Sequence, residues 1–119
     1  MATLLIEDPV FLRHVVPPGH PERPDRLRAI DEILADEAFA GLDRRPAPVS
    51  DFDRVALAHE RSYIDEIRKA VPESGEMQVE SDTFMCPDSV NVALHAVGGA
   101  CLAVDEVMAG RAKNAFLSA

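Results

Sequence analysis

The sequence predicts an α/β fold with a parallel sheet flanked by helices, most of this chain being helical. A short apolar run, Thr3–Ile6, is typical of a buried strand of a parallel sheet. Asp88–Ala109 has the periodicity of a long helix, and Asn114–Leu117 resembles the start of another strand. This order indicates the opening of an α/β protein. One strand and half of another cannot form a sheet, so these elements require further chain or a second copy.

Composition limits the classes of partner. The 119 residues, 47% of them hydrophobic, suit one small domain or part of a larger one. The formal net charge of -9 repels phosphate backbones and anionic lipid, so we expect no nucleic-acid role and no membrane role. It is compatible with a cationic partner, such as a lysine-rich tail or a polyamine, although solubility alone also explains it.

The N-terminus and the cysteines predict a cytoplasmic protein. Met1–Ile6 has no basic residue before it and is cut off by Glu7-Asp8-Pro9, unlike an export signal. We find no apolar stretch of the roughly 18 residues that span a bilayer. Cys86 and Cys101 form no Cys-x-x-Cys motif and are interpreted as free thiols of a reducing compartment.

Prolines organise the first half of the chain. His14–Pro24 is rich in proline and is therefore expected to be an ordered loop. A helix should begin at Pro24 or Asp25 and end before Gly41. Asp43–Val49 is expected to be a loop or a short edge strand. The apolar face of the predicted helix consists of Leu27, Ile30, Ile33 and Leu34.

Two short helices are expected next. Ser50 and Ser62 each begin a Ser-x-x-acid pattern, which caps helix N-termini. These patterns predict helices over Asp51–Ala58 and Tyr63–Ala70, and a turn-rich stretch, Pro72–Pro87, follows.

The long helix has the strongest periodicity in the chain. Gly98-Gly99 interrupts it at about 1 kcal/mol per glycine relative to alanine, which a close approach by a neighbouring element would explain. Gly110 is placed where a helix ends. The expected apolar stripe consists of Val90, Leu94, Val97, Cys101, Val104 and Met108.

Several segments, all in the right order, resemble one enzyme family. Gly19–Leu27 is similar to a His-Pro-Glu-Arg-Pro-x-Arg-Leu segment of class II-like bacterial deacetylases, and Phe11–His14 resembles the stretch before it. Ala58-His59 with Tyr63 resembles a His-x-x-x-Tyr pattern.

Three later segments extend the resemblance. Ser81–Ser89 resembles the family's Asp-Thr-x-x-Ser-Pro-x-Ser loop, with Cys86 in place of the common serine. Ala96–Ala100 resembles its Ala-Ala-Gly-Gly helix, and Asn114–Phe116 opens its next strand. Across Thr3–Phe116 the chain thus resembles the N-terminal portion of the histone deacetylase and acetylpolyamine amidohydrolase family.

The resemblance implies the arginase/deacetylase fold, with residues 1–119 as the N-terminal part of one deacetylase domain. The implied activity is zinc-dependent removal of an acetyl group from an acetylated amine, such as acetyl-lysine or an acetylpolyamine. In the family, the strand opening with Asn-Ala-Phe continues into Arg-Pro-Pro-Gly-His-His, and the zinc ligands and catalytic tyrosine lie beyond it. Here the strand continues as Leu117-Ser118-Ala119, so we expect truncation before the zinc-binding segments.

The histidines present do not suggest a substitute zinc site. A hydrolytic zinc needs about three protein ligands and an open position. His59 is followed by Tyr63 where the zinc-protease pattern needs its second histidine. His14 and His20 are separated by prolines, with no paired aspartate. We therefore expect no catalytic residue, metal site or cofactor in this chain, which would be inactive alone. A stand-alone binding or assembly module is the alternative.

The resemblance assigns substrate binding to three positions. Asp82 matches a rim aspartate that accepts hydrogen bonds from the substrate; a turn aspartate bonding its own loop is the alternative. Arg26 matches an arginine in the cavity below the zinc that would hold the leaving acetate, because guanidinium donors form a fixed fork. A surface arginine is the alternative. His20, like His14, is interpreted mainly as ordering the Pro-rich loop, with substrate contact as the lesser role.

Partners follow from these assignments. An acetylated amine is expected to bind only once the C-terminal part of the family domain completes the site. His59 and Tyr63 are expected to form a packed pair, and His95 to lie on the surface. The apolar stripe and the edge of Thr3–Ile6 lack partners, so we expect a homo-oligomer, with helix exchange as one form.

Overall fold

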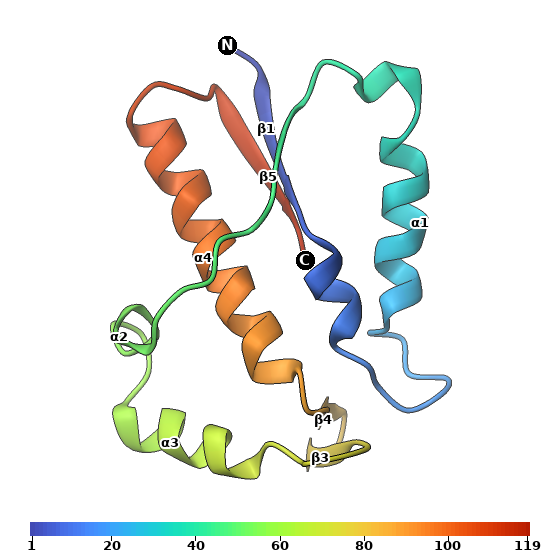
Figure 1. Cartoon of the computed structure of the whole chain (residues 1–119), viewed down its shortest axis with the longest axis vertical. Helices are drawn as coiled ribbons and strands as arrows, with labels where there is room; N and C mark the ends of the chain where they lie inside the picture. The colour runs from blue at the N-terminus through green and yellow to red at the C-terminus, as the bar shows by residue number, and fades with distance from the viewer.

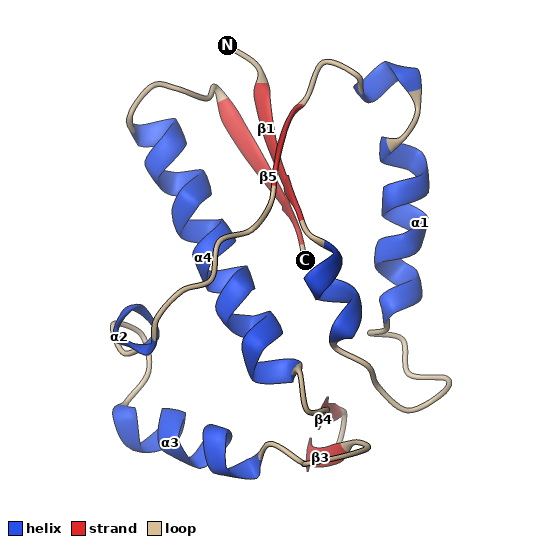
Figure 2. Ribbon diagram, viewed as in Figure 1, coloured by secondary structure: helices blue, strands red, loops and turns tan.

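A computed structural model describes residues 1–119. A parallel sheet lies between helices, as the predicted α/β class requires (Figures 1 and 2). Its strands are β1 (Thr3–Glu7), β2 (Asp43–Arg45) and β5 (Asn114–Ser118), in the order β2-β1-β5. Of the two alternatives for Asp43–Val49, a loop or a short edge strand, the structure shows a strand at its start, β2.

The strand β1 has no free edge, so the expectation of an unpartnered edge at Thr3–Ile6 is wrong. Leu4 pairs with Asp43 of β2, and Leu5 pairs with Phe116 of β5. Both faces of β1 are buried, which accounts for its uninterrupted apolar sequence. The free edges of the sheet belong to β2 and β5.

The helix α1 (Pro24–Leu34) begins at the predicted proline but is shorter than expected. It ends well before Gly41 because Asp36 starts a separate 3-10 helix, Glu37–Phe39, by accepting a hydrogen bond from the Ala38 N–H at 2.8 Å. The predicted apolar face is correct only in part. Leu27 is buried against the core, whereas Ile33 is 63% exposed.

The helices α2 (Phe52–Val55) and α3 (Arg61–Ala70) form where two short helices were expected. The predicted serine caps are wrong. Asp51 caps α2, with its carboxylate accepting from the Arg54 N–H at 3.0 Å, and α3 begins after Glu60 without a side-chain cap. The N-cap positions are instead Asp51, directly after Ser50, and Glu60, two residues before Ser62.

A β-hairpin occupies part of the stretch that was expected to be rich in turns. β3 (Met77–Glu80) pairs antiparallel with β4 (Thr83–Met85), with an irregularity between Gln78 and Glu80. The hairpin lies beside the end of α3, at the opposite end of the molecule from the N-terminus (Figure 1). All four residues of β3 are exposed.

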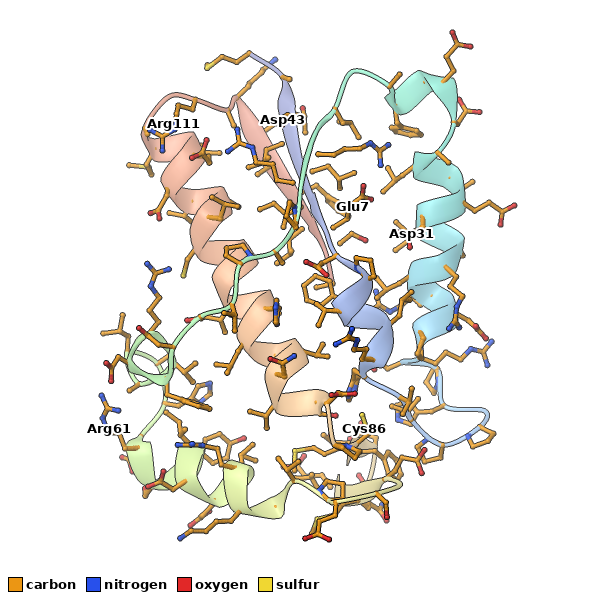
Figure 3. All side chains as sticks on the ribbon, in the orientation of Figure 1. Glu7, Asp31, Asp43, Arg61, Cys86 and Arg111 are labelled. Carbon is orange, nitrogen blue, oxygen red and sulfur yellow. The ribbon has the colours of Figure 1, made fainter.

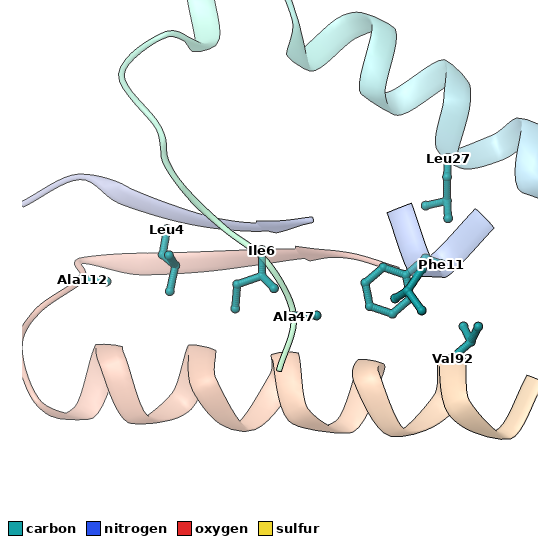
Figure 4. Close-up of a cluster of buried hydrophobic side chains, with 8 residues drawn as sticks. Leu4, Ile6, Phe11, Leu27, Ala47, Val92 and Ala112 are labelled. Atoms are coloured by element: carbon teal, nitrogen blue, oxygen red, sulfur yellow. The ribbon is translucent and has the colours of Figure 1, made fainter. Parts of the chain in front are cut away.

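The helix α4 (Ser89–Met108) covers one face of the sheet, and α1 lies on the other side (Figure 4). A Cβ atom added to Gly98 would lie 1.9 Å from the Pro48 carbonyl oxygen, and one on Gly99 would lie 2.9 Å from Leu117 Cδ1. The predicted close approach at the two glycines is therefore confirmed. Gly110, at φ +75°, follows the helix as predicted.

The predicted apolar stripe of α4 is not the face that packs on the sheet. Val92 and the two glycines are buried, whereas Val104 is 61% exposed and Met108 is 81% exposed. The large side chains dominate the periodicity of the sequence, but close packing uses the small ones. The core cluster joins β1, α1 and α4 (Figure 4) and consists of Leu4, Ile6, Val10, Phe11, Leu27, Ala47, Val92 and Ala112.

Length and composition alone would allow α4 to cross a membrane, which corrects the expectation that no stretch is long enough. In the fold, α4 packs through Gly99 against Ile6 and Leu117, side chains of the parallel sheet. This packing is typical of a core helix in an α/β domain.

Candidate functional site

A cavity of about 340 Å³ lies between the start of α1, the strand β4 and the first turns of α4. We call it the Arg26 cavity. Most of its wall is apolar, with Phe11, Phe84 and Val92 among the lining residues. An apolar hollow with a few convergent polar groups is the usual form of a small-molecule site. Its polar or charged lining residues include His14, Glu22, Arg23, Arg26, Thr83 and Ser89.

Arg26 lies in the wall of this cavity. Its Nη2 donates to the Ala119 carbonyl oxygen at 2.9 Å and to Glu22 Oε1 at 3.2 Å. The other carboxylate oxygen of Glu22 lies 3.4 Å from His14 Nε2. Glu22 thus links the arginine to the histidine. With its side chain 41% exposed, Arg26 is neither fully buried nor a free surface residue.

His14 connects this wall to the start of α4. Its Nδ1 lies 2.8 Å from Ser89 Oγ, which in turn accepts a hydrogen bond from the Cys86 N–H at 2.8 Å. The Cys86 thiol donates to the Arg13 carbonyl at 3.2 Å and is nearly fully buried. These bonds agree with the expected ordering role of His14, and they fix one side of the cavity.

His20 bridges the Pro-rich loop and the hairpin. Its Nε2 lies 2.7 Å from the Asp82 carbonyl oxygen, so this nitrogen carries the proton and donates. In the neutral ring Nδ1 then accepts from the Glu22 N–H at 3.1 Å. The ring also contacts Phe84 edge-on, at 5.6 Å between centroids. This geometry agrees with the loop-ordering interpretation of His20.

Asp82 lies between β3 and β4, and its carboxylate is exposed. Its Oδ1 accepts from Thr83 Oγ1 at 3.3 Å, the local bond expected of a turn aspartate. The three predicted substrate residues therefore separate into two groups. Arg26 lines the cavity, while His20 and Asp82 contact each other beside it. Their roles toward a substrate stay predictions.

Sequence reasoning missed Glu22 as a member of the site. It precedes α1 and lies four residues before Arg26, a spacing at which opposite charges meet on a helix. That spacing, together with its place in the Gly19–Leu27 segment, is the signal that would have found it.

No group of three or more His, Cys, Asp or Glu side chains in residues 1–119 is placed to hold a metal ion. His59 instead packs on Tyr63, at 5.3 Å between ring centroids, which confirms the predicted pair. His95 Nδ1 lies 2.8 Å from the Asn91 carbonyl oxygen. The residues present therefore do not fit a zinc ion, and we derive no step that uses one.

The shifted pKa values lie at the other end of the molecule. Glu106, in the last turn of α4, contacts Arg111 at 2.8 Å and Arg45 of β2 at 3.1 Å. The hydrogen bond from Arg111 lowers the pKa of Glu106, and the pKa values of both arginines are raised, chiefly by the hydrogen bonds that they donate to carboxylates. Figure 3 shows Arg111 far from Cys86, so this Glu106 cluster is separate from the cavity.

Comparison with known proteins decides the family. The family model described as the histone deacetylase domain matches residues 20–119. The chain belongs to the histone deacetylase family. The predicted resemblance is therefore confirmed, and it extends over the loop, the hairpin and α4.

Relatives of this histone deacetylase-family chain are longer than the chain itself. It is 31% identical over 99 residues to a histone deacetylase-like amidohydrolase of Pseudomonas aeruginosa, covering 82% of this chain and 26% of that protein. It is 35% identical over 102 residues to an uncharacterised protein of Synechocystis, covering 82% of this chain and 33% of that protein. The chain thus spans about a quarter to a third of these relatives.

A solved structure confirms the fold. The crystal structure of the HDA15 HD domain matches with a TM-score of 0.85 at 27% identity, covering 98% of this chain and 35% of that chain. The match and the parallel sheet with flanking helices confirm the predicted fragment of an arginase/deacetylase fold.

Proposed function

We propose that residues 1–119 form the N-terminal part of a zinc-dependent deacetylase domain that removes acetyl groups from acetylated amines. Family membership supports the reaction class. The observation that carries the proposal is the position of the Arg26 guanidinium in the wall of a mostly apolar cavity. Such a cavity suits a small acyl group, and a guanidinium suits the carboxylate that its hydrolysis releases.

Arg26 has unpaired N–H donors that could bind an anion. Both of its hydrogen bonds use Nη2, so its Nε and Nη1 have no partner within the protein. Glu22 holds the side chain in place from one side, and His14 holds Glu22. In the proposed role the free N–H groups would bind acetate as it leaves the site.

The 119 residues by themselves are proposed to be inactive. Amide hydrolysis at neutral pH requires a group that activates water and a donor that stabilises the oxyanion. When bound, zinc in the complete family domain would activate that water, with ligands from segments outside these residues. The lack of a ligand cluster also favours the second candidate, a non-catalytic binding or assembly module.

A chimeric protein would test the deacetylase proposal. Residues 1–119 would replace the matching segment of the Pseudomonas aeruginosa relative, and hydrolysis of an acetyl-lysine peptide would be measured. We expect zinc-dependent turnover by the chimera. Arg26→Ala should lower kcat roughly tenfold to a hundredfold, the cost of losing a hydrogen bond to a charged group.

Arg28→Ala is the matched control, because Arg28 lies on the same helix and its contact is an exposed one with Asp25. It should leave kcat unchanged. A folded chimera that retains zinc but shows no turnover would contradict the deacetylase proposal. Equal losses in the two arginine variants would contradict the role of Arg26.

A further inference from the structure

The strand β3 presents a surface that the Arg26 cavity does not use. In its two-stranded sheet β3 pairs only with β4, and all of its residues are exposed. A strand paired along one side leaves backbone N–H and C=O groups along the other, ready to pair with an extended chain. Two apolar side chains accompany this edge, Met77 at 44% and Val79 at 38% exposure.

The chain segment that carries this edge bears only negative charge. Residues 70–94 contain no lysine, arginine or histidine. None of their carboxylates takes part in an ion pair of the protein. The unpaired acidic residues of this segment are Glu73, Glu76, Glu80, Asp82 and Asp88.

We propose that the outer edge of β3 binds an extended peptide rich in lysine or arginine by adding it as a third strand. Backbone hydrogen bonds would supply the alignment, and the carboxylates at Glu76 and Glu80 would select positive side chains. A second copy of this chain is a poor occupant of this edge. Pairing β3 with another β3 would bring like charges together across the strands, which is destabilising.

The edge lies next to the proposed site of chemistry, and this inference rests on the proposed function for that connection. Thr83, Phe84 and Met85 of β4 line the Arg26 cavity. A peptide added to β3 would run one further strand spacing, about 4.8 Å, beyond β3. The edge would thus hold the cationic residues that flank an acetylated lysine rather than the acetylated residue itself.

Binding of a labelled peptide to the 119-residue chain tests this inference without any need for catalysis. The probe is a ten-residue peptide of alternating lysine and valine, compared with its glutamate counterpart, with spermidine and with the same peptide N-methylated at alternate residues. We expect the lysine peptide alone to bind well. The amide signals of Met77–Glu80 should shift on binding in NMR spectra.

Charge reversal supplies the matched variants. Glu76→Lys with Glu80→Lys should weaken binding about tenfold, since two attractive exposed pairs become repulsive. The control variant, Glu32→Lys with Glu37→Lys, changes the net charge by the same amount at exposed positions distant in sequence from β3. It should change the affinity for the peptide less than twofold.

Four results would overturn the inference. They are absence of binding, equal affinity in the two double variants, full binding by the N-methylated peptide, and displacement of the peptide by spermidine at an equal concentration of positive charge. If the peptide binds as expected but the chimera has no deacetylase activity, the proposed function fails and the peptide-binding edge stands.

Discussion

At the scale of single residues, Gly98 shows how one missing side chain positions the segment that follows β2. The Pro48 carbonyl lies where a Cβ would be, so the chain crosses α4 in direct contact with its backbone. We predict that Gly98→Ala lowers the free energy of unfolding by about 2 kcal/mol or more, because the clash with backbone outweighs the gain in helix propensity. Urea denaturation measures this change.

Gly41→Ala is the control for that substitution. A Cβ at Gly41 meets no atom within 4 Å, and the residue has no left-handed φ. Its stability should be unchanged or up to about 1 kcal/mol higher, through the entropy of the unfolded chain. Similar losses at both glycines would show that the close contact with Pro48 is not what Gly98 provides.

At the scale of elements, the Glu106 cluster ties the last turn of α4 to the edge strand β2. Because Arg111 lowers the pKa of Glu106 in the folded protein, the carboxylate contributes stability that is present above its unfolded pKa. That contribution is lost as the pH falls through the folded pKa, which lies below the ordinary value of 4.5. We predict that Glu106→Gln lowers the thermal midpoint by several degrees at pH 7.

The pH dependence distinguishes this effect from general damage. The difference in midpoint between Glu106→Gln and the unmodified chain should shrink as the pH is lowered below about 4.5. Asp65→Gln, at an exposed position in no ion pair, should leave the midpoint unchanged throughout. A difference that stays constant down to acidic pH would rule out the ion pairs as its source.

Elements with a local cause could be predicted, and those set by tertiary contacts could not. Pro24 and Gly110 impose their own backbone conformations, so the start of α1 and the end of α4 were predicted correctly. The hairpin was missed because its strands are short and mostly exposed, which leaves little hydrophobic pattern. The buried face of α4 was misjudged because small residues such as Gly99 allow contact that hydrophobicity does not reveal.

The candidate site divides in the same way. Arg26, His20 and Asp82 were selected by resemblance to a family motif. A motif gives the order of residues along the chain but not the distances between their side chains in the fold. Only the folded chain shows that Arg26 lines the cavity while His20 holds the Asp82 carbonyl. Glu22 was missed because its importance lies in contacts with both Arg26 and His14, which come from different elements.

At the scale of the whole molecule, the free edge of β5 is a candidate interface for the expected self-association. Phe116 at the centre of β5 is 53% exposed, and no strand lies beyond β5. We propose that two copies pair through this edge. Light scattering at micromolar concentration should show a dimer that Phe116→Asp weakens and Leu57→Asp, at an 88% exposed position off the sheet, does not. A monomer in all three proteins would contradict this.

Our central proposal is that these 119 residues supply a wall of a deacetylase site but not its metal centre. Its most direct test is elemental analysis of the purified chain after incubation with zinc and removal of loosely bound ions, alongside an acetyl-lysine peptide assay. We predict far less than one zinc per chain and no hydrolysis. A stoichiometric zinc ion held by side chains of this chain, with turnover that a chelator abolishes, would contradict the account.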